Sequence, residues 1–185
     1  MRRFFVRLVV RNLVGETFRP AARDNSGGII LKKSRFVFVS CLLGLLVTSA
    51  GLALLLLDES PEMKELMPIA WLIGFGAVLL LFHVLNHLVF RAEAGENSVK
   101  VRSLGGSRTV RYEELRSVGY SRFNSGQLVL QGAAGAIRIP AGIRGAAEFV
   151  ALISGKIGEA ACVDAIKALD VRREDLKKWG GEANV

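Results

Sequence analysis

The stretch that decides the fold is residues 36–57, FVFVSCLLGLLVTSAGLALLLL, followed after a short loop by residues 68–90, PIAWLIGFGAVLLLFHVLNHLVF. The first run has 22 residues and no charge, and the second has 23 residues with two histidines and one asparagine as its strongly polar groups. At about 1.5 Å rise per residue, a helix of either length reaches roughly 33–35 Å, enough for a hydrocarbon core of about 30 Å. Backbone amides in lipid must pair within their own segment. The sequence therefore predicts a transmembrane hairpin of two helices.

The net charge of +8 is unevenly distributed around these runs. Residues 1–35 carry nine Lys and Arg against two acids, the loop 58–67 carries four acids against one Lys, and residues 91–185 carry fifteen bases against eleven acids. Short flanks rich in Lys and Arg stay cytoplasmic, so both termini are expected in the cytoplasm and the acidic loop outside. The basic N-terminus thereby has a topological cause, and a nucleic-acid partner is not expected.

The N-terminal segment, residues 1–35, allows two interpretations. Arg3, Arg7 and Arg11 recur every four residues, as in a helix that lies in the membrane interface with its arginines on lipid phosphates. Alternation over residues 3–10 also fits a half-buried strand. Residues 28–34 favour a short strand or an extended lead-in to the first apolar run.

Residues 91–157 predict a small α+β module. Five short strands with Gly-rich turns between them indicate an antiparallel meander over residues 99–102, 109–111, 115–120, 127–131 and 136–139. From Gly142 the apolar period becomes helical, which predicts one closing helix. In the tail, residues 158–185, we expect two short helices, with Asp170 as the N-cap of the second, docked on a neighbouring surface.

At this point the chain resembles small bacterial membrane proteins that carry a two-helix transmembrane hairpin and a pleckstrin-homology-like (PH-like) domain. The resemblance is carried by residues 30–34 (ILKKS), 96–101 (ENSVKV), 110–118 (VRYEELRSV) and 137–140 (IRIP), and it covers roughly residues 29–157. It implies a cytoplasmic PH-like half-barrel and an inner-membrane setting, and it implies no activity. A full PH-like barrel has about seven strands, so we expect the missing ones from residues 3–11 and 28–33 or from a partner chain.

Three sets of residues are candidates for sites. Small side chains at helical spacing predict close helix packing, within the hairpin or in self-association, at Ser40, Gly44, Thr48, Gly51, Ala70, Gly74 and Ala77. His83 and His87 share a helix face beside Asn86; interhelical or interfacial hydrogen bonding is expected, with a haem, metal, proton or quinone role as the alternative. Four basic residues on one predicted hairpin, expected either on anionic lipid headgroups or on a solvated face, are Lys100, Arg102, Arg108 and Arg111.

No enzyme template fits the chain. The predicted soluble part has no histidine for Ser/His/Asp catalysis, and the Gly-rich turn 104–107 lacks the lysine of a phosphate loop. Cys41 and Cys162 lie in the first run and in the tail, so neither a disulfide nor a metal–cysteine site is expected. We therefore predict a non-enzymatic scaffold or accessory subunit of the bacterial inner membrane that binds a membrane protein partner, without a cofactor or small-molecule substrate. The rival hypotheses are a lipid-sensing module and a haem- or metal-binding or transport subunit.

Overall fold

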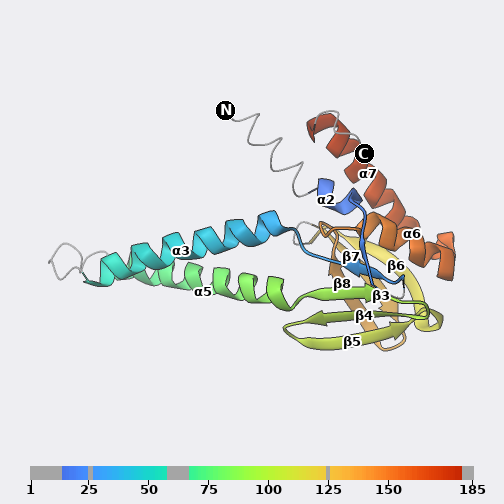
Figure 1. Ribbon diagram of the computed structural model, residues 1–185, viewed down its shortest axis with the longest axis horizontal. Coiled ribbons are helices and arrows are strands. Elements are labelled where there is room, and N and C mark those ends of the chain that lie inside the picture. Colours follow the sequence, from blue (N-terminus) through green and yellow to red (C-terminus); the bar gives the residue numbers. More distant parts are fainter. Residues whose placement is uncertain (1–13, 25–26, 58–66, 124–125, 181–185) are drawn as a thin grey trace. The chain divides into compact units, whose positions relative to one another are not determined.

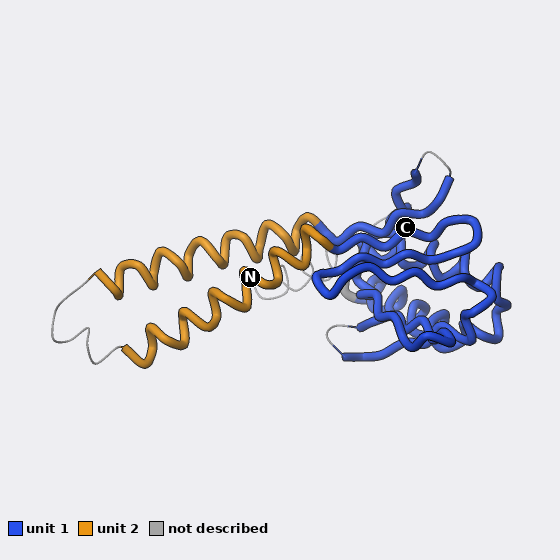
Figure 2. Tube along the Cα trace, turned by 90° about the horizontal axis from the view of Figure 1, so that it is seen from below, with its two compact units in different colours: residues 1–34, 90–185 blue, residues 35–89 orange. Residues whose placement is uncertain are grey.

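The computed structural model describes residues 14–24, 27–57, 67–123 and 126–180. The chain divides into two compact units (Figure 2): unit 1 comprises residues 1–34 and 90–185, and unit 2 comprises residues 35–89. Unit 1 is a mixed α+β unit with two antiparallel sheets, and unit 2 is a pair of long helices. The described residues of the N-terminal segment, 14–24 and 27–34, thus belong to the same unit as the C-terminal half.

The first sheet of unit 1 has five strands in the order β1-β2-β3-β4-β5, of which β3, β4 and β5 are labelled in Figure 1. Their bounds are Ala22–Arg23, Ile29–Leu31, Arg91–Ala94, Ser98–Ser103 and Gly106–Arg111. The predicted strand at residues 28–34 is confirmed as β2, whereas β1 and β3 were not predicted. Val99 and Val101 are buried while Lys100 and Arg102 are exposed, so the alternation in the sequence decides which face of β4 meets the core.

Strand β3 forms because both of its edges are paired. Leu31 of β2 lies opposite Ala92, and Ala94 lies opposite Val99 of β4. Ala92 and Ala94 are almost completely buried between these neighbours. Alanine and glutamate have low strand propensity, so the pairing rather than the local sequence holds Arg91–Ala94 extended.

The second sheet has the order β6-β7-β8, with bounds Leu115–Ser121, Gln127–Gly132 and Gly135–Pro140. These three strands match the sequence prediction. A short 3₁₀ turn at Tyr112–Glu114 joins β5 to β6. Helix α6, Ala146–Ile157, follows and buries Phe149, Val150 and Ile153 in a core that also contains residues of both sheets.

The tail folds as one helix rather than two. After a 3₁₀ turn at Glu159–Cys162, helix α7 runs without a break from Val163 to Gly180, and it packs against β6. Asp170 is an exposed residue inside this helix, so the prediction that it caps a second helix is wrong. The buried side chains of Cys162, Ala165, Leu169 and Leu176 follow a single helical stripe, which makes a continuous helix the better way to bury them.

Residues 15–23, which we call the N-terminal strap, begin with helix α2, Gly15–Phe18, and pack on the start of α6. Thr17 Oγ1 donates a hydrogen bond to the Ala141 carbonyl at 2.9 Å, and Arg144 Nε donates to the Pro20 carbonyl at 2.8 Å. Gly145 has φ 84°, and a Cβ built there would lie 2.5 Å from the Cβ of Ala21. A glycine is therefore required where the strap crosses α6.

Unit 2 consists of helix α3, Arg35–Leu57, and helix α5, Met67–Val89, which pack against each other. Both predicted runs are confirmed as helices, each within one residue of the expected bounds. Each is long and apolar enough to cross a membrane. No residue of α3 is buried, and large apolar side chains on both helices are open, with Leu57 79% exposed and Trp71 76% exposed.

Candidate functional site

The four predicted basic residues do not share one face of the sheet. Lys100, Arg102 and Arg111 are exposed on the outer face of β4 and β5. Arg108 lies directly opposite Val101, whose side chain is buried, so Arg108 belongs to the inner face. The β4–β5 hairpin thus carries all four predicted residues, but Arg108 lies on the opposite face from the other three. The sequence does contain a signal for this, because side chains alternate between the two faces of a strand: Val110 is buried, so Arg108, two residues before it, lies on the same face.

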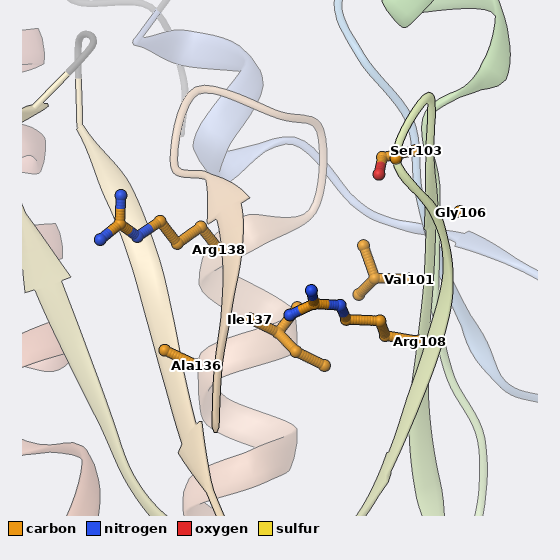
Figure 3. Close-up of a pocket in the computed structure, with 8 residues that line it drawn as sticks. Val101, Ser103, Gly106, Arg108, Ala136, Ile137 and Arg138 are labelled. Atoms are coloured by element: carbon orange, nitrogen blue, oxygen red, sulfur yellow. The ribbon is translucent and has the colours of Figure 1, made fainter. Parts of the chain in front are cut away.

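A pocket of about 260 Å³ lies beside Arg108, between the β4–β5 hairpin and the start of β8. Figure 3 shows the Arg108 side chain reaching toward Ile137, whereas the Arg138 side chain extends away from Arg108. Val101 and Ile137 contribute apolar side chains to a pocket wall that also contains polar ones. Only one of the two arginines at this pocket therefore points into it.

The outer face carries a row of polar side chains that the sequence prediction did not identify. Arg91 of β3 lies opposite Arg102 of β4, and Arg102 lies opposite Ser107 of β5. All three residues are exposed. We call Arg91, Arg102 and Ser107 the outer row. Arg91 was missed because β3 was not predicted, although residues 91–94 do alternate between polar and small apolar side chains.

The outer row lies at the end of the sheet where the chain leaves and returns. Strand β2 ends at Leu31 and leads to α3 through residues 32–34, and α5 ends at Val89 and leads to β3 through Phe90. The Lys33 ammonium lies 4.8 Å from the centre of the Phe90 ring, a cation–π contact between the two connections. We call this end of the five-stranded sheet the exit end. The Leu104-Gly105 turn of the β4–β5 hairpin lies at the same end, because Arg102 pairs with Arg91.

The outer edge of β5 pairs with no strand among the described residues. Because the β4–β5 turn has two residues, every second residue of β5, beginning with Gly106, forms backbone hydrogen bonds to β4. The hydrogen bond from the Tyr112 N–H to the Asn97 carbonyl, at 3.1 Å, continues this alternation. This alternation turns the backbone groups of Ser107, Thr109 and Arg111 toward the open edge. An open edge offers a second strand a ladder of backbone donors and acceptors.

The histidine positions lie on α5. His83 is exposed, and the His87 ring lies 5.1 Å from the ring of Phe38 on α3, tilted by 43°. Asn86 is half-buried. Within the described part of the chain, no group of three or more His, Cys, Asp or Glu side chains is placed to hold a metal ion. The haem or metal alternative therefore stays a hypothesis that needs ligands from a second chain.

The predicted small-residue positions differ in whether they lie where α3 and α5 pack against each other. A Cβ at Gly44 would meet Leu80 at 3.5 Å, and one at Gly74 would meet Leu52 at 3.7 Å, so both glycines lie where the two helices pack. A Cβ at Gly51 would meet nothing within 4 Å. The remaining positions are Ser40, which is exposed, Thr48, whose hydroxyl donates to the Gly44 carbonyl, Ala70, which is buried, and Ala77, which is half-buried.

Two buried titratable groups belong to unit 1. Burial raises the pKa of the Tyr112 hydroxyl, which donates a hydrogen bond to the Gly95 carbonyl at 2.9 Å. Burial also raises the pKa of the Cys162 thiol, which packs in the core where α7 begins. Both groups are therefore neutral at physiological pH and suited to packing rather than to acid–base chemistry. The arginines predicted to contact lipid at the N-terminus, Arg3, Arg7 and Arg11, lie outside the described residues.

In comparisons with known proteins, no protein-family model matches the chain, and no curated protein and no solved structure matches it either.

Proposed function

We propose that the protein is a non-enzymatic scaffold or accessory subunit of the bacterial inner membrane, in which α3 and α5 anchor unit 1 at the bilayer so that it binds a membrane protein partner. One observation carries this proposal: the apolar hairpin is inserted between β2 and β3, two strands that pair with each other. The connections are residues 32–34 on one side and Phe90 on the other. Unit 1 is thus tied to the hairpin at two adjacent strands by very short connections.

The exposure of α3 and α5 supports the membrane setting. Each helix has 23 residues, which corresponds to about 34 Å at 1.5 Å per residue. Leaving apolar side chains such as those of Leu57 and Trp71 in water would cost roughly 25 cal/mol for each Å². Because β2 and β3 pair, residues 34 and 90 must emerge on the same side of the bilayer. The basic flank 1–35 favours the cytoplasmic side.

The strand count supports a PH-like module. Strands β2 to β8 number seven: β2 to β5 belong to the first sheet, and β6 to β8 form the second. Helix α6 follows the last strand. A PH-like barrel has about seven strands and a closing helix. The two strands beyond the five of the predicted meander are β2, which the sequence predicted, and β3, which it did not; they lie on either side of the inserted helices.

The open edge of β5 supports binding of a partner strand. Addition of an extended segment to a sheet edge gains affinity from backbone hydrogen bonds and specificity from alternate side chains. Arg108 and Arg111 make this edge positive, so two copies of β5 would repel each other if they paired. The partner segment we propose is therefore an extended one with acidic side chains.

Photo-crosslinking in native membranes tests the partner. A crosslinking residue at Arg111 should capture a protein, and Thr109→Pro should abolish that capture, because the proline removes an outward N–H while the β4–β5 bonds remain. A crosslinker at Gln131, on the exposed face of the central strand β7, is the matched control, since both edges of β7 are paired. Capture that is equal at Gln131, or that survives Thr109→Pro, would contradict a partner at this edge.

Contact with anionic lipid is the second candidate function, and the outer row at the exit end favours it. A lipid contact and a partner strand use different groups of unit 1, the outer-row side chains and the β5 backbone edge. The Thr109→Pro variant removes only the second of these.

A further inference from the structure

The outer row places like charges directly opposite each other. Arg91 and Arg102 are cross-strand partners, and the side chains of such partners lie roughly 5 Å apart at Cβ on the same face. Arg91 forms an ion pair with Glu93, and Glu93 lies opposite Lys100. These four residues thus carry three positive charges and one negative charge. No carboxylate among the described residues pairs with Arg102. A pair of like charges on neighbouring strands destabilises a sheet unless an anion compensates it.

The row also supplies donors of the kind that bind phosphate. Guanidinium groups present planar, forked N–H donors that match phosphate oxygens, and a serine hydroxyl adds one more donor. Arg91, Arg102 and Ser107 come from three adjacent strands, so their spacing is fixed by the sheet rather than by a loop. A rigid set of three donors with excess positive charge is suited to a phosphate group.

The position of the row along the chain points to the source of that phosphate. Arg91 is two residues beyond Val89, the last residue of α5, which is roughly 7 Å of extended chain. Leu104 is 41% exposed at the tip of the β4–β5 hairpin, two residues beyond Arg102. An apolar tip next to arginines is the pattern of an element that touches the boundary between headgroups and acyl chains.

We propose that Arg91, Arg102 and Ser107 form a binding site for the phosphate group of an anionic phospholipid in the membrane that holds α3 and α5. This inference rests on the proposed membrane anchor. The phosphate lies across the two guanidinium groups and neutralises their repulsion, while Leu104 contacts the apolar boundary of the same leaflet. The site deepens the proposed function because it would fix the exit end of unit 1 against the bilayer.

The test uses the full chain, purified in mild detergent, stripped of lipid and titrated with phosphatidylglycerol, with bound lipids counted by native mass spectrometry. Arg91→Gln together with Arg102→Gln should weaken binding of the tightest phosphatidylglycerol about thirtyfold, from two lost headgroup contacts. The matched control, Arg116→Gln together with Arg122→Gln, removes the same charge from exposed residues outside the outer row and should change binding less than threefold.

Further arms separate the alternatives. Phosphatidylcholine should show no comparable tight binding, and inorganic phosphate should leave the phosphatidylglycerol preference intact at matched ionic strength. Competition by inorganic phosphate would overturn the lipid in favour of a soluble phosphate ligand, and equal weakening by both charge pairs would overturn the site. Arg102→Lys keeps the positive charge but loses the forked N–H donors of the guanidinium group, so it should weaken phosphatidylglycerol binding severalfold. Binding as tight as in the wild type would contradict recognition of the phosphate by a guanidinium group. Release of the wild-type chain from membranes by alkaline carbonate would instead refute the anchor itself.

Discussion

Glu148→Ala should release the N-terminal strap from α6 without unfolding unit 1. Glu148 Oε2 accepts a hydrogen bond from the Ala21 N–H at 2.9 Å, and Glu148 Oε1 accepts one from Arg23 Nη2 at 2.5 Å. A hydrogen bond to a charged acceptor contributes about 1.5–3 kcal/mol, and an exposed ion pair about 0.2–1 kcal/mol. The Glu148 side chain is 33% exposed and that of Arg23 is 63% exposed, so the low end of both ranges applies. The expected loss is about 2 kcal/mol.

Hydrogen exchange of the full chain in detergent micelles, read by mass spectrometry over residues 18–24, measures this loss locally. A change of about 2 kcal/mol corresponds to roughly thirtyfold faster exchange at the Ala21 amide. Glu148→Gln keeps an oxygen acceptor and should give a smaller increase, and Glu159→Ala, at an exposed residue of the 3₁₀ turn, should give none. An unchanged rate in Glu148→Ala, or an equal rise in β7, would refute the reasoning that Glu148 holds the strap.

Three further outcomes are expected. Gly44→Ile should weaken the packing of α3 on α5 by about 1–3 kcal/mol, because its side chain meets Leu80, while Gly51→Ile should be nearly neutral; unfolding in mixed micelles compares them, and equal effects would count against the packing. Phe149→Ala should cost about 3–5 kcal/mol by leaving a cavity in the core of unit 1, measured as a lower thermal midpoint; a midpoint unchanged from wild type would show that the core is not where we place it. Because burial raises the pKa of the Cys162 thiol, the protonated thiol contributes to the stability of the folded state below the ordinary thiol pKa of 9.0, and this stability is lost as pH rises through the pKa of the folded state. Cys162→Ala should therefore lose less stability at alkaline pH than the wild type. Identical pH profiles of stability for the two chains would contradict this prediction.

Much of the fold can be predicted from the length and periodicity of the apolar segments alone. The runs 36–57 and 68–90 are long and apolar enough that only helices fit, and both boundaries lie within one residue of α3 and α5. The alternation in residues 115–139, with glycine turns between, predicts β6 to β8. In each case the local pattern and the final burial agree.

The rest depends on pairing that no local pattern carries. Ala92 and Ala94 are poor strand formers, and they become a strand only because β2, from before the helices, lies beside them. Without β3, Arg91 could not be placed opposite Arg102, so the outer row was not predicted. For α7, an aspartate after Leu169 resembled a cap, yet the buried stripe continues to Leu176 and overrides it.

The central claim is that α3 and α5 cross a bilayer and leave unit 1 on the cytoplasmic side. The most direct measurement labels single cysteines with a membrane-impermeant thiol reagent in intact bacterial cells, in a chain carrying Cys41→Ser and Cys162→Ala. Our account predicts that Glu62→Cys, in the acidic loop, is labelled in intact cells, whereas Glu96→Cys, an exposed residue of unit 1, is labelled only after permeabilisation. Labelling of Glu96→Cys in intact cells, or protection of both positions, would contradict it.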